Sequence, residues 1–97
     1  MKKYLILCTR HESVYGDNWC LWWGYKDSKN GYSSDIRTAY RFTEEEIKPF
    51  LDDKEDIPID ISILGINDIY EENINENFVQ LIEKGTLNKL LDLRLSR

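Results

Sequence analysis

The segment from residue 19 to residue 25 constrains the fold most, because it carries apolar side chains on both faces. Successive side chains of an extended strand point to opposite faces, so Trp23 lies on one face while Cys20 and Trp22 lie on the other. Such a strand is typical of the centre of a sheet, or of a sheet with one face covered by a helix and the other by a partner. Apolar residues 4–10 precede it across a turn-forming stretch, which predicts two antiparallel strands joined by a loop.

Turn and capping signals predict the structure after the second strand. The composition of residues 26–34, which include an Asn-Gly dipeptide, predicts a loop. Asp35 is placed to cap a short helical turn. Thr43 and Glu46 have the spacing of a capping box, in which each side chain satisfies a free amide at a helix start. We therefore expect a short helix after Thr43, disturbed by the proline near its end.

Isoleucines alternate with other residues over positions 57–63, a period of two that indicates a half-buried strand. Pro58 lacks an amide proton, so it restricts this strand to a sheet edge or stands at the strand's first position. Asp60 can also cap a helical turn here. The sequence thus leaves both a strand and a short helix open for residues 57–66.

The closing region has helical periodicity. One apolar stripe is formed by Ile74, Phe78, Leu81 and Ile82. We expect Gly85 to end that helix and Thr86 to cap a final turn or two. That last piece carries Leu87, Leu90 and Leu91. Together the signals predict a single α+β domain over residues 1–97. It is a small antiparallel sheet packed by a C-terminal helix or helix pair, with a short capped helix between strands.

Charge divides unevenly along the chain. Residues 1–42 hold seven basic and four acidic residues and nine of the twelve aromatic rings, whereas residues 43–97 hold six basic and fourteen acidic residues. The two parts therefore carry net charges of +3 and −8. Spaced carboxylates on a folded surface reproduce the electric field of phosphates, so such a surface can occupy a basic groove built for nucleic acid.

This pattern predicts a protein partner with a basic nucleic-acid-binding site, and no direct binding of nucleic acid. Self-association stays open. The expected contact residues are acidic or aromatic: Glu44, Glu45, Asp52, Asp53, Glu55, Asp56, Trp22, Trp23, Tyr25 and Tyr32.

Two other functions stay open. The aromatic cluster can form core, interface or a platform for stacked bases, and a nucleotide-binding protein would use Trp22 or Trp23 for the base. Its phosphate would be held by Arg10, Arg37 or Arg41. A minimal enzyme would be centred on His11, the only histidine, between Arg10 and Glu12. The plainer interpretation of His11 is a solvated strand end.

The sequence predicts no catalytic residue, metal site or cofactor. Cys8 and Cys20 lie in apolar runs without zinc-ligand spacing, so we expect buried thiols in a reducing compartment. The acidic residues 52–56 lack the alternating ligands and turn glycine of a calcium loop. No export signal or membrane span is expected, which predicts a cytoplasmic protein.

Residues 22–47 also resemble a recurring pattern. It consists of a tryptophan-containing strand, the run Gly31-Tyr32-Ser33 with Asp35, Ala39, and an aromatic-Thr-x-Glu-Glu step that begins at Phe42. The segment is similar to small uncharacterised accessory proteins of bacteriophages and other mobile elements. The resemblance implies a strand, a turn and a capped helix, and it transfers no catalytic residue. It favours a non-enzymatic inhibitor of a host nucleic-acid-handling or defence protein, such as an anti-CRISPR protein.

Overall fold

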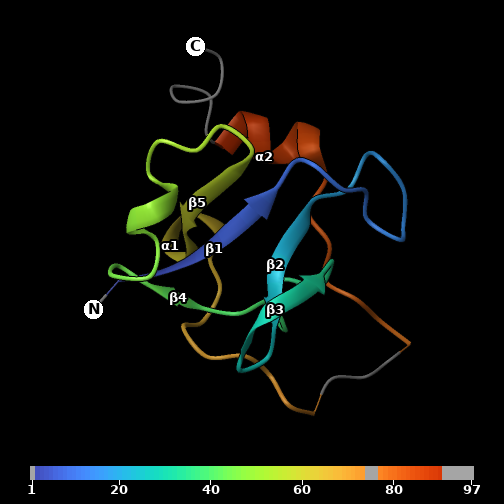
Figure 1. Cartoon of the computed structure of the whole chain (residues 1–97). Helices are drawn as coiled ribbons and strands as arrows, with labels where there is room; N and C mark the ends of the chain where they lie inside the picture. The colour runs from blue at the N-terminus through green and yellow to red at the C-terminus, as the bar shows by residue number, and fades with distance from the viewer. Residues whose placement is uncertain (1, 74–76, 91–97) are drawn as a thin grey trace.

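A computed structural model of the protein describes residues 2–73 and 77–90. It shows a five-stranded antiparallel sheet with three short helices, which confirms the predicted α+β fold (Figure 1). The elements in chain order are β1 (Lys3–Cys8), β2 (Leu21–Tyr25), β3 (Ser28–Ser33), β4 (Phe42–Thr43), the 3₁₀ helix η1 (Lys48–Phe50), β5 (Asp56–Asp60), α1 (Ile61–Leu64) and α2 (Lys84–Leu90).

Strand β1 is the centre of the sheet. Strand β5 pairs along it from Tyr4 to Cys8, so β2 and β4 share the other edge of β1. The predicted antiparallel pairing of the first two strands is confirmed, with both strands shorter than expected. Among the described residues β5 pairs only with β1, so Pro58 lies in an edge strand, as its missing amide requires.

Both alternatives that were open for residues 57–66 occur in succession. Strand β5 ends at Asp60, and α1 begins at the next residue. The Asp60 carboxylate accepts a hydrogen bond from the Ser62 amide at 2.9 Å, and Gly65 ends the helix with a φ of 69°. Asp60 therefore closes the strand and caps the helix.

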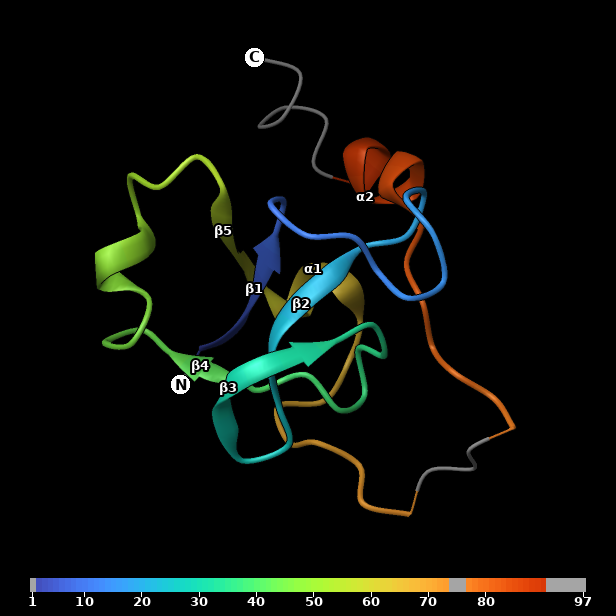
Figure 2. The same cartoon turned by 45° about the vertical axis from the view of Figure 1, so that its right-hand side comes forward.

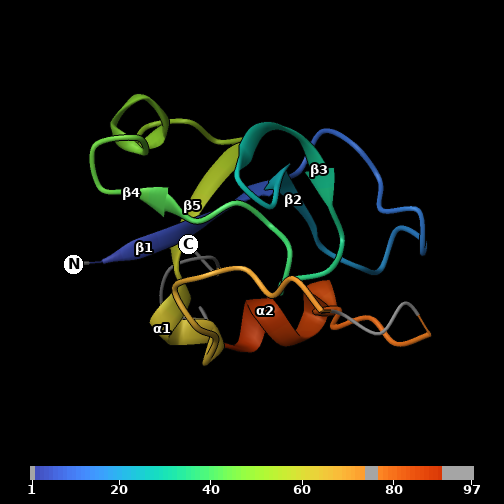
Figure 3. The same ribbon diagram turned by 90° about the horizontal axis from the view of Figure 1, so that it is seen from below.

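The sheet is covered on both faces by the protein's own chain, as Figure 3 shows. Helices α1 and α2 pack on one face and contribute Ile61 and Leu87 to a core that includes Leu5 and Trp22. The segment between β4 and β5 covers the opposite face. That second cluster consists of Ile6, Phe42 and Ile47 with the partly buried Tyr4, Trp23, Tyr40 and Phe50.

The prediction that residues 26–34 form a loop is wrong, because β3 occupies most of this segment. The hairpin turn is Lys26 and Asp27, and Lys26 has a φ of 54°. Strand β3 contains the Asn-Gly dipeptide, and its Tyr32 lies opposite Trp23. Packing between cross-strand neighbours overrides the local turn preference of two residues.

The capping box is confirmed. The Thr43 amide donates to Glu46 Oε1 at 2.9 Å, and the Glu46 amide donates to Thr43 Oγ1 at 3.2 Å. The chain then forms turns and the single 3₁₀ turn η1 rather than an α-helix. Residues 35–39 likewise form a turn, in which Asp35 Oδ1 accepts the Arg37 amide at 2.9 Å.

The helix predicted from the apolar stripe at residues 74–82 is wrong for residues 77–82, which are not helical. The carbonyls of Gln80 and Ile82 accept hydrogen bonds from Ile36 and Cys20, so this segment bonds to the body of the protein instead of to itself (Figure 2). Gly85 lies inside α2 rather than after a helix. Ile74 and Leu91 lie outside the described residues.

Candidate functional site

Residues 44–55, which we call the acidic loop, carry most of the predicted acidic contact residues. Five carboxylates of this loop are exposed: Glu44, Glu45, Asp52, Asp53 and Glu55. Leu51 lies among them with 63% of its surface exposed. Lys48 pairs with Glu45 at 2.9 Å, but the loop keeps a net negative charge. An exposed leucine in the same segment as five exposed carboxylates is a feature that the charge pattern alone did not single out.

Asp56 is the exception among the acidic residues, and its predicted place on the surface is wrong. Its exposure is 5%, and both carboxylate oxygens are occupied. Arg10 Nη2 donates to Oδ2 at 2.9 Å, and Trp23 Nε1 donates to Oδ1 at 2.8 Å. A carboxylate can be buried at low cost only when such donors replace its water, so Asp56 is structural.

The two neighbouring tryptophans have different positions. Trp22 is completely buried between the sheet and the helices, so its predicted role in a contact surface is wrong. Trp23 is half-buried on the opposite face, where its ring lies 4.5 Å from the Tyr32 ring and 5.8 Å from the Arg10 guanidinium. Of the two, only Trp23 can reach a ligand from the described surface.

A groove of about 400 Å³ lies beside Trp23 on the face that the acidic loop covers. We call it the groove. It is lined by Ile6, Arg10, Trp23, Lys29, Phe42, Glu46, Phe50 and Asp56. Most of these residues were not predicted from the sequence, because they come from separate segments of the chain. An apolar pair, Phe50-Leu51, within a highly charged stretch was the available signal.

Glu46 ties the acidic loop to the strands. It accepts hydrogen bonds from the Tyr40 hydroxyl at 2.9 Å and from the Thr43 amide, and it pairs with Lys29 at 3.1 Å. Burial alone would raise the pKa of Glu46, but these donors outweigh burial and lower the pKa to about 2.

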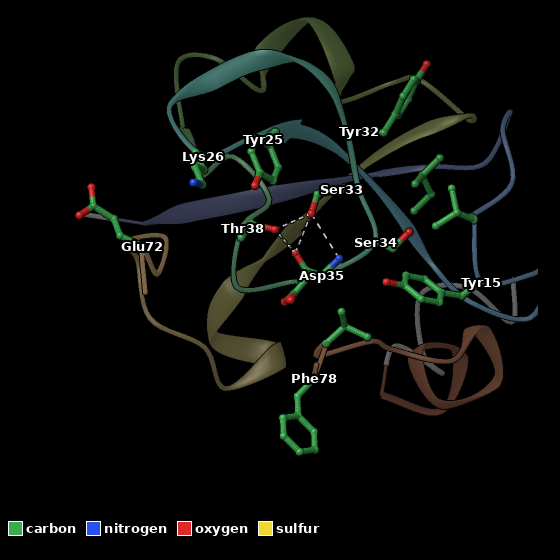
Figure 4. Close-up of a pocket in the computed structure, with 13 residues that line it drawn as sticks. Tyr15, Tyr25, Lys26, Tyr32, Ser33, Ser34, Asp35, Thr38, Glu72 and Phe78 are labelled. Atoms are coloured by element: carbon green, nitrogen blue, oxygen red, sulfur yellow. Dashed lines mark hydrogen bonds between the residues drawn. The ribbon is translucent and has the colours of Figure 1, made fainter. Parts of the chain in front are cut away.

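A second hollow, which we call the cleft, contains the other predicted aromatic residues. It has a volume of about 410 Å³ and includes Tyr25 and Tyr32, which are 48% and 38% exposed (Figure 4). Its floor is a hydrogen-bonded group in which Ser33 Oγ lies 2.7 Å from Thr38 Oγ1 and donates to the Asp35 carbonyl. Tyr25 therefore belongs to a hollow distinct from the groove, whereas Tyr32 also packs on Trp23.

Two of the three arginines predicted to hold a phosphate are largely buried and bind groups of the protein itself. Arg37 binds the Asp35 carboxylate through two nitrogens, at 3.0 and 2.7 Å, and these bonds hold the pKa of Asp35 below its usual value despite its burial. Arg41 is 8% exposed and donates to backbone carbonyls, and burial lowers its pKa. Arg10 is exposed at the surface and donates to Asp56 through Nη2 at 2.9 Å.

His11 is exposed, and its ring meets the edge of Tyr32 at 5.2 Å without a hydrogen bond to a described side chain. Within residues 2–73 and 77–90 no group of three potential metal ligands is found. The same residues contain no helix with the length and apolar character needed to cross a membrane. Comparison with protein-family models, curated proteins and solved structures finds no match to this chain.

Proposed function

We propose that this protein is a non-enzymatic binding protein that blocks a basic, nucleic-acid-binding site of another protein with its acidic loop. The observation that carries this proposal is that five carboxylates and Leu51 are all exposed on one short loop. Carboxylates at such spacing attract a surface built for phosphates, and charge complementarity accelerates association and selects the partner. An exposed leucine at the centre adds apolar contact area that a purely electrostatic surface lacks.

The acidic loop is held in shape before it meets a partner. The capping box fixes its start, and Asp53 Oδ1 fixes its end by accepting the amides of Glu55 at 2.7 Å and Asp56 at 3.0 Å. These bonds hold the pKa of Asp53 below its usual value. A loop that is already ordered loses less conformational entropy on binding, which supports its use as a contact surface.

The resemblance of residues 22–47 to phage accessory proteins supports the class of partner. We therefore take the target to be a nucleic-acid-handling or defence protein of a host cell, with a CRISPR effector as one candidate. The protein would then act in the host cytoplasm.

The proposal is tested by affinity capture with the tagged protein from a bacterial lysate that contains CRISPR and other defence complexes. We expect the protein to retain a nucleic-acid-binding enzyme that salt releases and added DNA displaces. The variant E44K/E45K/D52K should retain none of it. The matched control E12K/D17K/D27K reverses three exposed carboxylates outside the loop and should bind like the parent. Equal capture by both variants would overturn the electrostatic proposal.

The cleft supports a second candidate, a small aromatic ligand such as a nucleotide. Tyr25, Tyr32 and Lys26 line it, and a base stacked on Tyr32 would change the emission of Trp23, which contacts that ring. Titration with a nucleotide panel should then quench fluorescence in the parent and not in Tyr32→Ala. An unchanged emission across the panel would count against this candidate.

A further inference from the structure

The groove is the part of the second sheet face that the acidic loop leaves uncovered. Ile6 and Phe42 form its base, with exposures of 0% and 4%, and the half-buried rings of Trp23 and Phe50 form its walls. Phe50 ends η1, so one wall belongs to the acidic loop itself. The wall formed by Phe50 is therefore followed in the chain by the exposed Leu51, Asp52 and Asp53.

The charged residues at the rim of the groove already satisfy one another. Arg10 pairs with Asp56 at 2.9 Å, and Lys29 pairs with Glu46 at 3.1 Å, so the four charges sum to zero. Both oxygens of each carboxylate accept hydrogen bonds from the protein. Because these charges cancel, a charged group that entered the groove would lose its water and gain no net attraction from them. The groove thus favours an uncharged, apolar occupant.

The surroundings of the groove determine what must flank that occupant. Glu46, Phe50 and Asp56 line the groove, and every exposed carboxylate of the acidic loop lies within three positions of one of them in the chain. Residues on either side of a side chain seated in the groove would therefore meet negative charge. Lysine and arginine are the residues that complement it.

We propose that the groove binds one large apolar side chain, aromatic by preference, from a partner segment that carries lysine or arginine on both sides of it. This inference rests on the proposed function and names the chemistry of its contact. A volume of about 400 Å³ accommodates such a side chain, and aromatic rings gain from edge and offset contacts with Trp23, Phe42 and Phe50. The anchor would supply the buried centre of the interface, and the basic residues its polar rim.

The test is a selection of random short peptides displayed on phage against the immobilised full chain. We expect the enriched peptides to carry a Trp, Tyr, Phe or Leu flanked by Lys or Arg. Synthetic copies of the best peptide are then compared by calorimetry. Replacing its anchor by Ala should weaken binding by about tenfold or more. Replacing its basic residues by Gln should remove the salt dependence of binding.

Variants of the protein show whether the peptide binds in the groove. Phe50→Ala, which removes one wall without removing a hydrogen bond, should weaken binding of the parent peptide and leave binding of the anchor→Ala peptide unchanged. Trp23→Phe is the second groove variant, and near-ultraviolet circular dichroism verifies that both fold. Tyr15→Ala, at a half-exposed position of the cleft, is the control and should bind like the parent.

The outcomes separate the two proposals. Two outcomes would overturn the groove inference and leave the acidic loop as the contact surface. One is enrichment of basic peptides without an apolar anchor, and the other is peptide binding that is unchanged by Phe50→Ala and Trp23→Phe. Enrichment without basic residues, together with unchanged binding by E44K/E45K/D52K, would overturn both. A selection that yields no enriched peptide would also overturn the groove inference.

Discussion

Trp22 and Trp23 are adjacent in the chain, yet the two indole nitrogens lie in opposite environments. Trp23 Nε1 donates to Asp56 Oδ1 at 2.8 Å. Trp22 Nε1, within the described part of the chain, is buried without a hydrogen-bond partner. A buried donor that loses its water without replacement is unfavourable, so the packing of the Trp22 ring must offset that cost. Trp22 thus packs in the core, whereas Trp23 lines the groove and donates the hydrogen bond that helps to bury Asp56.

This difference predicts a specific energetic coupling. In a double-mutant cycle by urea denaturation, Trp23→Phe and Asp56→Asn should be coupled by about 1 kcal/mol, because Trp23→Phe removes the donor of this hydrogen bond and Asp56→Asn removes the charge of its acceptor. Trp22→Phe and Asp56→Asn should be additive within roughly 0.5 kcal/mol. Equal coupling in the two cycles would contradict the assignment of Asp56 to Trp23.

Gly24 and Gly31 allow backbone strain and steric clash to be separated. Both have a positive φ, 85° and 83°. A Cβ added at Gly24 would overlap Tyr40 Cβ and lie 2.8 Å from the Ser28 carbonyl oxygen, whereas one added at Gly31 meets nothing within 4 Å. Gly31→Ala should therefore cost only the strain of a left-handed residue, about 1–3 kcal/mol. Gly24→Ala should cost clearly more or prevent folding, which thermal denaturation of the pair would measure.

Glu46 should make the protein sensitive to acid. Its folded-state pKa of about 2 lies below the ordinary value of 4.5, so the folded state binds fewer protons in this range. The stability that Glu46 contributes is present above about pH 4.5 and is lost as the pH falls toward 2. Glu46→Gln should flatten the fall of the unfolding free energy over this window. The exposed neighbour variant Glu45→Gln should keep the parent's slope.

Both thiols should be inert in the folded protein. Cys8 and Cys20 are 1% and 0% exposed, and burial raises the pKa of Cys20 to about 11. Reaction with a thiol reagent at mildly alkaline pH should therefore be slow in native buffer and complete after unfolding in guanidinium chloride. Rapid reaction of one thiol in native buffer would contradict the packing described for that residue. Cys20→Ser would identify which one reacts.

Local signals predicted the parts of the fold that depend on neighbouring residues. The capping box of Thr43 and Glu46 forms as expected. The cap at Asp60 and the edge position of Pro58 are each one of the two alternatives that the sequence left open. Each involves groups within a few positions of one another, or a backbone property of a single residue, so spacing along the chain is sufficient to read it. The exposed carboxylates of the acidic loop were predictable for a similar reason, because unpaired charges stay in water.

The sequence by itself therefore determined the fold class, the caps and the charge of the acidic loop, and only the tertiary structure decided which side chains reach the surface. Arg10 and Asp56 are 46 positions apart in the chain, and no local pattern shows that Arg10 will pair with Asp56 and allow its burial. The alternation of β2 separated Trp22 from Trp23 but did not indicate which face the helices cover. Such contacts depend on how distant segments pair, because burial is a property of the assembled sheet and its two coverings.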